Sequence, residues 1–547
     1  MRFILGVCVL LLTAGFTFPF MVSLRYEEKI KEKLPDWIAQ SSGGLYLATI
    51  GDLDINMFSK TLELKNIVLK PDLLKIRNLP ADSVPPTIYN IRIPSCRVTG
   101  IRWADLLAGR DVSCKSFLIS DPEIDICKTG AAPKQRGERT SKTSFRAGTI
   151  KTLRPVFRFT DCNGRDTSFI HLKGRLIVLH DWVYTAESQA DSSRWFFARK
   201  GELEIDSLIL KKKDELYALK TGRIAFKSGN NSFSVRNLAL LPALSRDAYY
   251  RRIGRQDELF TVKIPELRLN GLDWKALSSE GALYCGQMEL LKPYMHIYLS
   301  RLLPPDTSLK KGKFPNQLLR QMKIPFSIKE VRIADGDFEY TEYTDKSGKE
   351  GTVTINGIQA NITGLSNRQS DIAVHPHCTG RLSGKLMKTA NLSMQLDLGM
   401  SDSRGSFSLV AELGTMEGTR LNDVLNPLAL VELKSLDHKK LMYSIAGDET
   451  KARYTMSWLY NDLKVKILGR EADGSLSGKG VMSFMVNHAL VYSDNPEPGA
   501  AIRQVKGSMV PEPRKSFFNL IWAGVRQGAL LTAGRNSGIS AMVESKH

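Results

Sequence analysis

The feature that most constrains the fold is an alternation of apolar and polar residues with a period of two, which begins near residue 45 and recurs along the chain. Leu392 to Leu398 alternate with polar residues, a Ser-Asp-Ser-Arg-Gly turn follows, and Phe407 to Leu413 alternate again. Such alternation is typical of strands that bury one face. We therefore predict a mainly β fold, built largely as an antiparallel sheet. Helical patterns are few, at the N-terminus, at 315–322 and at 517–531.

An internal duplication is the most specific pattern in the chain. Residues 93–126 align with residues 264–297 at a constant offset of 171 and without a gap. The identical positions in the first copy are Ile93, Pro94, Arg97, Gly100, Trp103, Leu106, Cys114, Pro122 and Ile126. Repeated units usually stack so that neighbours bury a shared apolar face, which predicts an elongated molecule. Two separate homologous domains are the alternative.

The N-terminal segment is apolar over the length of a membrane span. Phe3 to Val22 contains no charged residue, and at ~1.5 Å per helical residue it crosses the ~30 Å hydrocarbon core of a bilayer. A cleaved signal peptide is the alternative, but the run exceeds a usual apolar region of that kind and no A-x-A-like site follows it. We predict an uncleaved anchor. The flanking charges do not decide its orientation.

The sequence resembles the AsmA-like family, relatives of the bacterial bridge-like proteins that carry lipid between membranes. Besides the N-terminal anchor, four short segments carry the resemblance: Gly51 to Ile67, the duplicated Ile-Pro…Gly-x-x-Trp-x-x-Leu block, Ile328 to Gly336 with Asn356 to Leu365, and Pro513 to Asn519. The last of these is similar to the ending of Bacteroidetes members. Together they cover nearly the whole chain, although each is short and degenerate.

The resemblance implies a single-pass anchor in the inner membrane, a body in the periplasm and a role in outer-membrane lipid homeostasis. It also implies a long, curved sheet whose concave face forms an apolar groove for phospholipid or another anionic lipid. Because the chain is short for spanning a periplasm, the resemblance also allows envelope assembly proteins as partners. The family offers no catalytic residues, and no cofactor is expected.

These patterns divide the chain into five parts. We expect an anchor at 1–24, a first β repeat with a basic loop at 25–148, a second β repeat at 149–323, a continuing sheet at 324–510, and a C-terminal amphipathic helix with its tail at 511–547. The helix at 517–531 is expected either to plug the end of the sheet or to rest on a membrane surface.

The predicted lipid contacts are apolar residues of the alternating strands. They are Leu392, Met394, Leu396, Leu398, Phe407, Leu409, Met456, Trp458, Val465 and Ile467. A closed core and an open groove both need one apolar strand face, so the period of the pattern does not distinguish them. In a groove, each buried methylene of an acyl chain would contribute ~0.8 kcal/mol.

The charge balance predicts acidic partners. Lys and Arg number 77 against 57 Asp and Glu, a formal net charge of +20. Basic clusters at 211–213, 251–252 and 310–313 are either solvated strand edges or contacts to anionic head groups. Nucleic acid is disfavoured, because the chain has no recognition helix or RNP-like aromatic motif.

Motifs for chemistry are largely absent from the sequence. The stretches 380–385 and 474–479 read G-x-x-x-G-K, one residue short of a P-loop, and lack its Ser or Thr. His375-Pro376-His377-Cys378 places three ligand-type residues together but has no fourth ligand nearby. No C-x-x-C occurs, so the cysteines are either buried thiols or members of one or two structural disulfides. We therefore predict a protein that is not an enzyme; a scaffold for outer-membrane protein assembly is the alternative function.

Overall fold

The computed structural model describes residues 31–535, apart from gaps at 32–34, 37, 41, 81–82, 104, 106–111, 131–143, 162–168, 186, 189–190, 192–193, 195 and 212–215. Strands account for 56% of the protein and helices for 17%, so the prediction of a mainly β fold is confirmed. The predicted anchor at 1–24 lies outside the described residues. The chain divides into two compact units, residues Met1–Ala239 with Gly271–Glu280, and residues Leu240–Asn270 with Gly281–His547.

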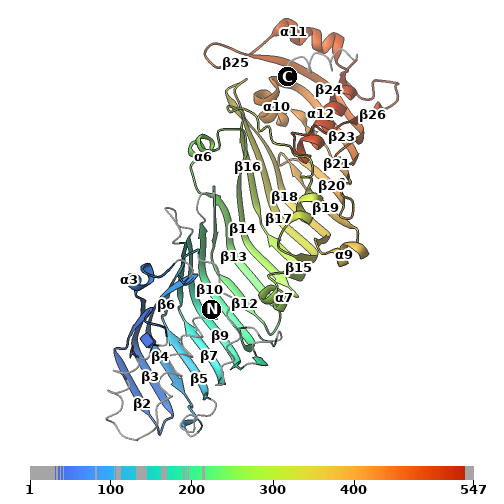
Figure 1. Ribbon diagram of the computed structural model, residues 1–547. Coiled ribbons are helices and arrows are strands. Elements are labelled where there is room, and N and C mark those ends of the chain that lie inside the picture. The colour runs from blue at the N-terminus through green and yellow to red at the C-terminus, as the bar shows by residue number, and fades with distance from the viewer. Residues whose placement is uncertain are drawn as a thin grey trace. The chain divides into compact units, whose positions relative to one another are not determined.

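Unit 1 is built from thirteen of the described strands and two short helices (Figure 1). Its elements are β1 Tyr46–Thr49, β2 Asp52–Asn56, β3 Thr61–Pro71, α3 Leu73–Arg77, β4 Thr87–Thr99, β5 Val112–Ser120, β6 Glu123–Lys128, β7 Phe145–Leu153, β8 Val156–Asp161, β9 Phe169–Tyr184, β10 Ala198–Lys211, β11 Tyr217–Thr221, β12 Ile224–Lys227, β13 Ser232–Pro242 and α7 Trp274–Ser279. One face of these strands is deeply buried; Ile93, Ile124 and Trp182, for example, are at most 2% exposed.

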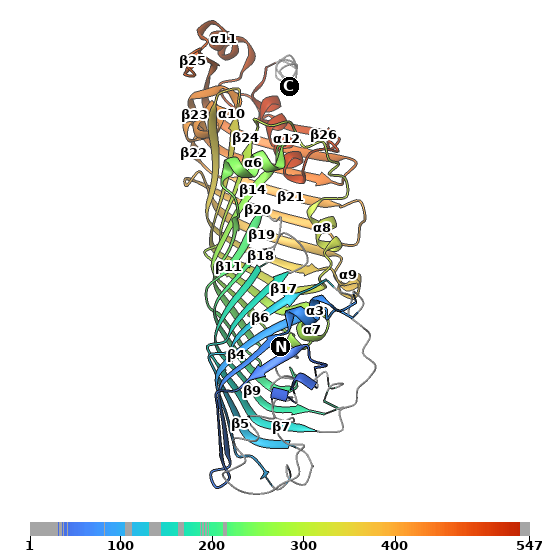
Figure 2. The same ribbon diagram turned by 60° about the vertical axis from the view of Figure 1, so that its left-hand side comes forward.

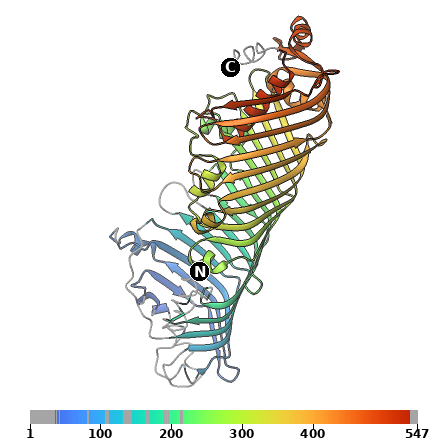
Figure 3. The same cartoon turned by 90° about the vertical axis from the view of Figure 1, so that its right-hand side faces the viewer.

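Unit 2 holds the remaining strands and most of the described helices (Figure 3). Its elements are α6 Arg246–Ile253, β14 Glu258–Asn270, β15 Leu283–Leu291, β16 Tyr294–Ser300, α8 Pro315–Gln321, β17 Phe326–Thr344, β18 Lys349–Ser366, α9 Gln369–Val374, β19 His377–Leu386, β20 Ala390–Gly399, β21 Phe407–Leu413, β22 Met416–Glu417, η1 Gly418–Leu421, α10 Asn422–Ala429, β23 Val431–Gly447, β24 Ala452–Arg470, β25 Leu476–Gly478, α11 Gly480–Met485, η2 Val486–Leu490, β26 Gln504–Met509 and α12 Phe517–Ala533. The predicted helices at 315–322 and 517–531 are confirmed as α8 and α12.

The sheet is mixed, so the prediction of an antiparallel sheet holds only in part. In unit 1, β5 pairs with β7 and β6 with β8 in parallel, and in unit 2 both β15 and β16 pair in parallel with β17. Parallel neighbours require a crossover of a dozen or more residues. The segment 301–325, which contains α8, provides that crossover between β16 and β17. From β17 to β24, successive long strands pair antiparallel.

The duplication in the sequence is also a duplication of strand geometry. β3, β4 and β5 have the same bounds as β13, β14 and β15 after the offset of 171. The register repeats as well, since Ser95 lies opposite Ser120 and Glu266 lies opposite Leu291. Asn66 and Asn237 even share a positive φ, of 51° and 52°. Each copy therefore places a left-handed asparagine at the same point of its first strand.

One local prediction fails where the backbone geometry departs from the usual pattern. Apolar residues alternate on both sides of Asn461-Asp462, which predicts a turn between two strands. The pair lies instead inside the continuous strand β24, where Asp462 has a φ of 52° and the register shifts. This is a bulge, which changes the face of the following residues without reversing the chain. The helix α10 contains Pro427, a residue that disfavours helix interiors.

Candidate functional site

The predicted contact residues gather on one face of unit 2. In one cross-strand row Met394 lies opposite Ala411, Ala411 opposite Tyr443, and Tyr443 opposite Met456. Neighbouring rows run through Leu392, Leu413, Leu441 and Trp458, through Leu396, Leu409, Ile445 and Tyr454, and through Leu398 and Phe407. Side chains directly opposite each other on paired strands share a face. Eight of the ten predicted residues therefore lie on this surface, which we call the apolar face.

The other two predicted residues lie beyond the bulge at Asp462. Val465 pairs with Leu433 and packs against a second hydrophobic cluster that includes Leu463 and Val491. Ile467 pairs with Val431, and its amide donates to the Ser483 hydroxyl over 2.9 Å. Neither belongs to the cross-strand rows that join Met394 to Met456. The structure thus brings eight candidates together and places two elsewhere.

The apolar face is covered at one end of its strands and partly exposed in the middle. Leu398, Phe407, Leu409 and Met456 are buried, at 1–6% exposure. Leu392, Met394, Leu396 and Trp458 are only partly buried. The same intermediate burial continues on Leu382 of β19 and Ile362 of β18. A stretch of hydrocarbon surface across three neighbouring strands is therefore accessible to solvent.

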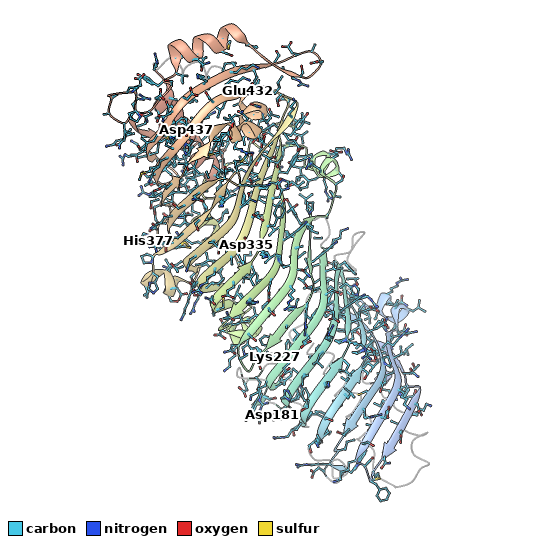
Figure 4. The ribbon with its side chains drawn as sticks, turned by 180° about the vertical axis from the view of Figure 1, so that it is seen from behind. Asp181, Lys227, Asp335, His377, Glu432 and Asp437 are labelled. Carbon is cyan, nitrogen blue, oxygen red and sulfur yellow. The ribbon has the colours of Figure 1, made fainter. Side chains whose placement is uncertain are left out.

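The opposite face of the same strands is polar. Ser393 and Gln395 alternate with the apolar residues of β20 and are exposed, as is Arg381 on β19. In Figure 4, His377 and Asp437 mark two further exposed residues of unit 2, on β19 and β23. A pocket of about 600 Å³ lies among these outward residues, lined by Arg332, Asn361, Arg381, Gln395, Val410 and Glu412 among others. The sheet is thus strongly two-sided.

The helix α12 covers the closed end of the apolar face (Figure 2). Its buried residues, Phe517, Leu520, Gly524, Gly528 and Thr532, are spaced three or four apart and form one stripe. Gly524 lies against the Tyr443 hydroxyl, and a Cβ at Gly528 would lie 2.9 Å from the Met456 sulfur. The two glycines therefore let the helix backbone approach the sheet closely.

An aromatic cluster fixes the start of α12 and of α8. The ring centroids of Phe314 and Phe517 are 5.2 Å apart, and those of Phe407 and Phe517 are 4.8 Å apart, both in edge-to-face geometry. Asn316 of α8 is fully buried and donates to the carbonyls of Gly399 and Ser406. The start of α12 is therefore held against β21 through Phe407, and α8 against the ends of β20 and β21 through Asn316.

A polar network holds the other end of α12. The Arg503 guanidinium donates to the Thr532 carbonyl over 3.1 Å and stacks 3.9 Å from the centroid of the Tyr492 ring. Asn495, which is 1% exposed, bonds the backbone of Trp458 and of Arg503. Buried polar groups that are satisfied in this way specify one packing arrangement. The helix is therefore fixed at both ends.

Gly524, Gly528 and Tyr443 were not predicted as part of the site. The signal that identifies the glycines is their spacing of four within a segment that is otherwise helical and apolar. Glycine costs about 1 kcal/mol in a helix interior relative to alanine, so two of them on one face indicate a close contact. Tyr443 has no comparable signal, because an aromatic residue in a strand is common.

His438 is the histidine most closely connected with the apolar face. It is 3% exposed, and its Nδ1 accepts a hydrogen bond of 2.8 Å from the Trp458 indole. Burial lowers the pKa of His438 below its ordinary value. The ring is therefore neutral at pH 7, and its proton sits on Nε2 because Nδ1 acts as an acceptor.

The His375-Pro376-His377-Cys378 cluster does not converge on one point. His377 is exposed and its Nδ1 lies 2.6 Å from a carboxylate oxygen of Asp397, whereas Cys378 is 3% exposed and belongs to the hydrophobic core. Burial raises the pKa of Cys378 to about 11. Adjacent residues of a strand point to opposite faces, and no group of three metal-ligating side chains occurs among the residues that the structure describes.

The remaining candidates occupy separate places. Cys127 is disulfide-bonded, whereas Cys114 and Cys285 are thiols whose pKa burial raises to about 12 and about 11. In the basic clusters, Lys310 pairs with Asp306 over 2.5 Å, and Arg251 and Arg252 occupy the last turn of α6. Residues 212 and 213 lie outside the described residues, and the described members of the three clusters lie in separate segments of the chain.

Comparisons with known proteins identify no relative of this chain, so the candidate site is described from its geometry alone. Within the part of the chain that the structure describes, no helix combines the length and apolar character that a membrane crossing requires. A scan against family models found no match, and a search of curated proteins found no similar sequence.

Proposed function

We propose that this protein is a membrane-anchored, non-enzymatic envelope protein of the AsmA-like type, which binds or transfers phospholipid along an apolar β groove. In this proposal Phe3 to Val22 anchors the chain in the inner membrane and the body lies in the periplasm. The strands curve so that their apolar faces form one groove. The lipid would support homeostasis of the outer membrane.

The observation that carries the proposal is the partly exposed middle of the apolar face. Leu382, Leu392, Met394 and Leu396 present hydrocarbon to solvent on β19 and β20, while the residues between them form a polar surface. At about 25 cal/mol per Å² of apolar surface removed from water, covering this stretch is favourable. An acyl chain would do so without specific polar ligands, in agreement with the scattered charges.

The disulfide at Cys127 supports the proposed compartment. Disulfides persist in the bacterial periplasm and are rare in the cytosol, where thiols are kept reduced. The net charge of +20 supports a partner with anionic head groups.

A matched pair of variants on one strand tests the groove. Met394→Glu places a carboxylate on the apolar face, whereas Gln395→Glu places the same group on the polar face, one residue away. Full-chain protein purified in a mild detergent would be analysed for bound phospholipid by mass spectrometry. We expect bound lipid in the parent protein and in Gln395→Glu, and a loss of at least tenfold in Met394→Glu. Equal lipid in both variants, or none in the parent, would contradict the proposal.

A scaffold for outer-membrane protein assembly is the second candidate, and the polar face favours it. Val410 and Met442 are 52% and 49% exposed there, and the strand partner of Met442, Glu412, lines the 600 Å³ pocket with Val410. Exposed apolar side chains beside a pocket are typical of protein contacts. Capture of an outer-membrane insertion component that is lost in Val410→Ser/Met442→Ser, with bound lipid absent, would favour this function over the first.

A further inference from the structure

We infer that the exposed sides of α8 and α12 form a docking surface for an anionic phospholipid bilayer, separate from the groove and from the predicted anchor. The surface consists of two segments, residues 309–326 and 510–526. It goes beyond the proposed function, since a membrane contact here does not depend on whether lipid occupies the apolar face.

Large apolar side chains point outward from both segments. Phe518 and Trp522, one helical turn apart on α12, are 72% and 55% exposed. Met322 and Ile324, directly after α8, are 50% and 56% exposed. The opposite sides of both helices are buried in the core through Leu319 and Leu520. The helices therefore have one side packed against the sheet and a second apolar side that no described residue covers.

The two segments meet at the residues that precede their helices. The Phe314 and Phe517 rings are in contact, and the Lys310 amide donates to the Pro513 carbonyl over 2.7 Å. In Figure 2, α8 lies beside β20, whereas α12 lies along β24 and β26. The two segments are therefore joined within unit 2, where α12 covers part of the apolar face.

The charge of the surface identifies its partner. The two segments contain eight basic residues, Lys310, Lys311, Lys313, Arg320, Lys323, Arg514, Lys515 and Arg526, against one acidic residue, Glu512. Arg514 and Lys515 are exposed directly before α12. An apolar surface with Trp and Phe, flanked by Lys and Arg, is typical of helices that lie in the interface of anionic membranes. Lys310 is already paired with Asp306 of the same chain, but a neutral partner would offer no counter-charge to the exposed Arg514 and Lys515.

A fluorescence experiment on the full chain tests the surface. An environment-sensitive dye is attached at Phe518→Cys, or at Val410→Cys on the polar face as the control, and unmodified protein treated with dye corrects for native cysteines. The protein is reconstituted in nanodiscs of phosphatidylcholine. The N-terminal segment can then insert into the nanodisc bilayer and does not need to insert into the added vesicles. Vesicles with about 30% phosphatidylglycerol, or of phosphatidylcholine alone, are then added.

We expect a blue shift at position 518 with the anionic vesicles alone, and none at position 410. Adding Arg514→Gln and Lys515→Gln should weaken vesicle affinity about 25-fold, because each basic residue near such a surface contributes about 1 kcal/mol, or about fivefold. No shift at 518, an equal shift at 410, or an affinity unchanged by the two substitutions would overturn the inference. The phospholipid bound to the purified protein is measured separately by mass spectrometry. Bound phospholipid without a shift at position 518 would contradict the docking surface but not the groove.

Discussion

Tyr443 on β23 lies directly against Gly524 on α12, so that a methyl group at position 524 would overlap the tyrosine hydroxyl. The same hydroxyl donates a hydrogen bond to the Ile521 carbonyl over 3.4 Å, and Tyr443 is 2% exposed. The ring cannot move aside without leaving the core. This contact therefore sets how closely the helix approaches the apolar face, and hence where the covered part of the face ends.

Substituting Gly524 by alanine is expected to destabilise the protein although alanine favours helices. The overlap with Tyr443 should cost about 1–3 kcal/mol, as overpacking of a core does, which outweighs the gain of about 1 kcal/mol in helix propensity. Thermal unfolding and limited proteolysis near α12 would measure it. Gln527→Ala, on the exposed side of the same helix, is the control. A raised midpoint in Gly524→Ala would show that α12 does not need this close contact.

The faces of the strands could be predicted from sequence because the period of two is local. Met394 and Gln395 are assigned to opposite faces by the pattern alone, and the structure agrees. The apolar pattern of a strand does not show whether its neighbour runs parallel or antiparallel to it. The parallel pairing of β15 with β17 was therefore not predicted. Likewise, Asp462 adopts a left-handed backbone that Asn-Asp pairs use in turns and bulges alike.

The extent of cover over the apolar face could not be predicted. Leu392 and Leu398 occupy equivalent positions in one alternating strand, yet Leu398 is buried under the elements that Phe314 and Phe517 bring to it, and Leu392 is partly exposed. That difference depends on contacts between residues more than a hundred positions apart. The apolar pattern of a helix or strand shows which of its faces is apolar. Which other elements cover that face depends on tertiary packing.

Acid is expected to destabilise the region around Trp458 through His438. Burial lowers the pKa of His438 below the ordinary value of 6.5, so the folded protein binds this proton less readily than the unfolded chain. Stability from the neutral ring is therefore fully present above pH 6.5 and is lost as the pH falls toward the lowered pKa. Protonation of Nδ1 would also break the bond from Trp458. Thermal unfolding at pH 7.5 and 5.5 measures the loss, which should be smaller in His438→Gln; identical pH dependence in both proteins would contradict this assignment.

Asp121 and Arg154 form an ion pair whose charges are reversed in the second copy of the repeat. Both residues have positive φ, and Arg154 donates to Asp121 over 2.5 and 2.7 Å, which lowers the pKa of the carboxyl. Lys292 and Asp335 occupy the equivalent positions, also with positive φ, and the Lys292 Nζ lies 3.8 Å from a carboxylate oxygen of Asp335. Asp121→Lys alone should lower the unfolding midpoint slightly through like-charge repulsion, and Asp121→Lys/Arg154→Asp should restore it. If the double variant does not regain the unfolding midpoint of the parent protein, the stability of this ion pair depends on more than the charges of the two side chains.

The disulfide at Cys127 gives the most direct test of the proposed compartment. Peptide mapping without reduction should find Cys127 cross-linked when the protein is isolated from the cell envelope, because only an oxidising compartment maintains such a bond. Protein made in a reducing cytosol should carry Cys127 as a thiol and unfold more readily, since loss of a native disulfide typically costs 2–5 kcal/mol. Cys285→Ser, at a buried thiol of the second repeat, controls for the loss of a sulfur atom. A reduced Cys127 in envelope-derived protein of full stability would remove the support that this disulfide gives to a periplasmic body.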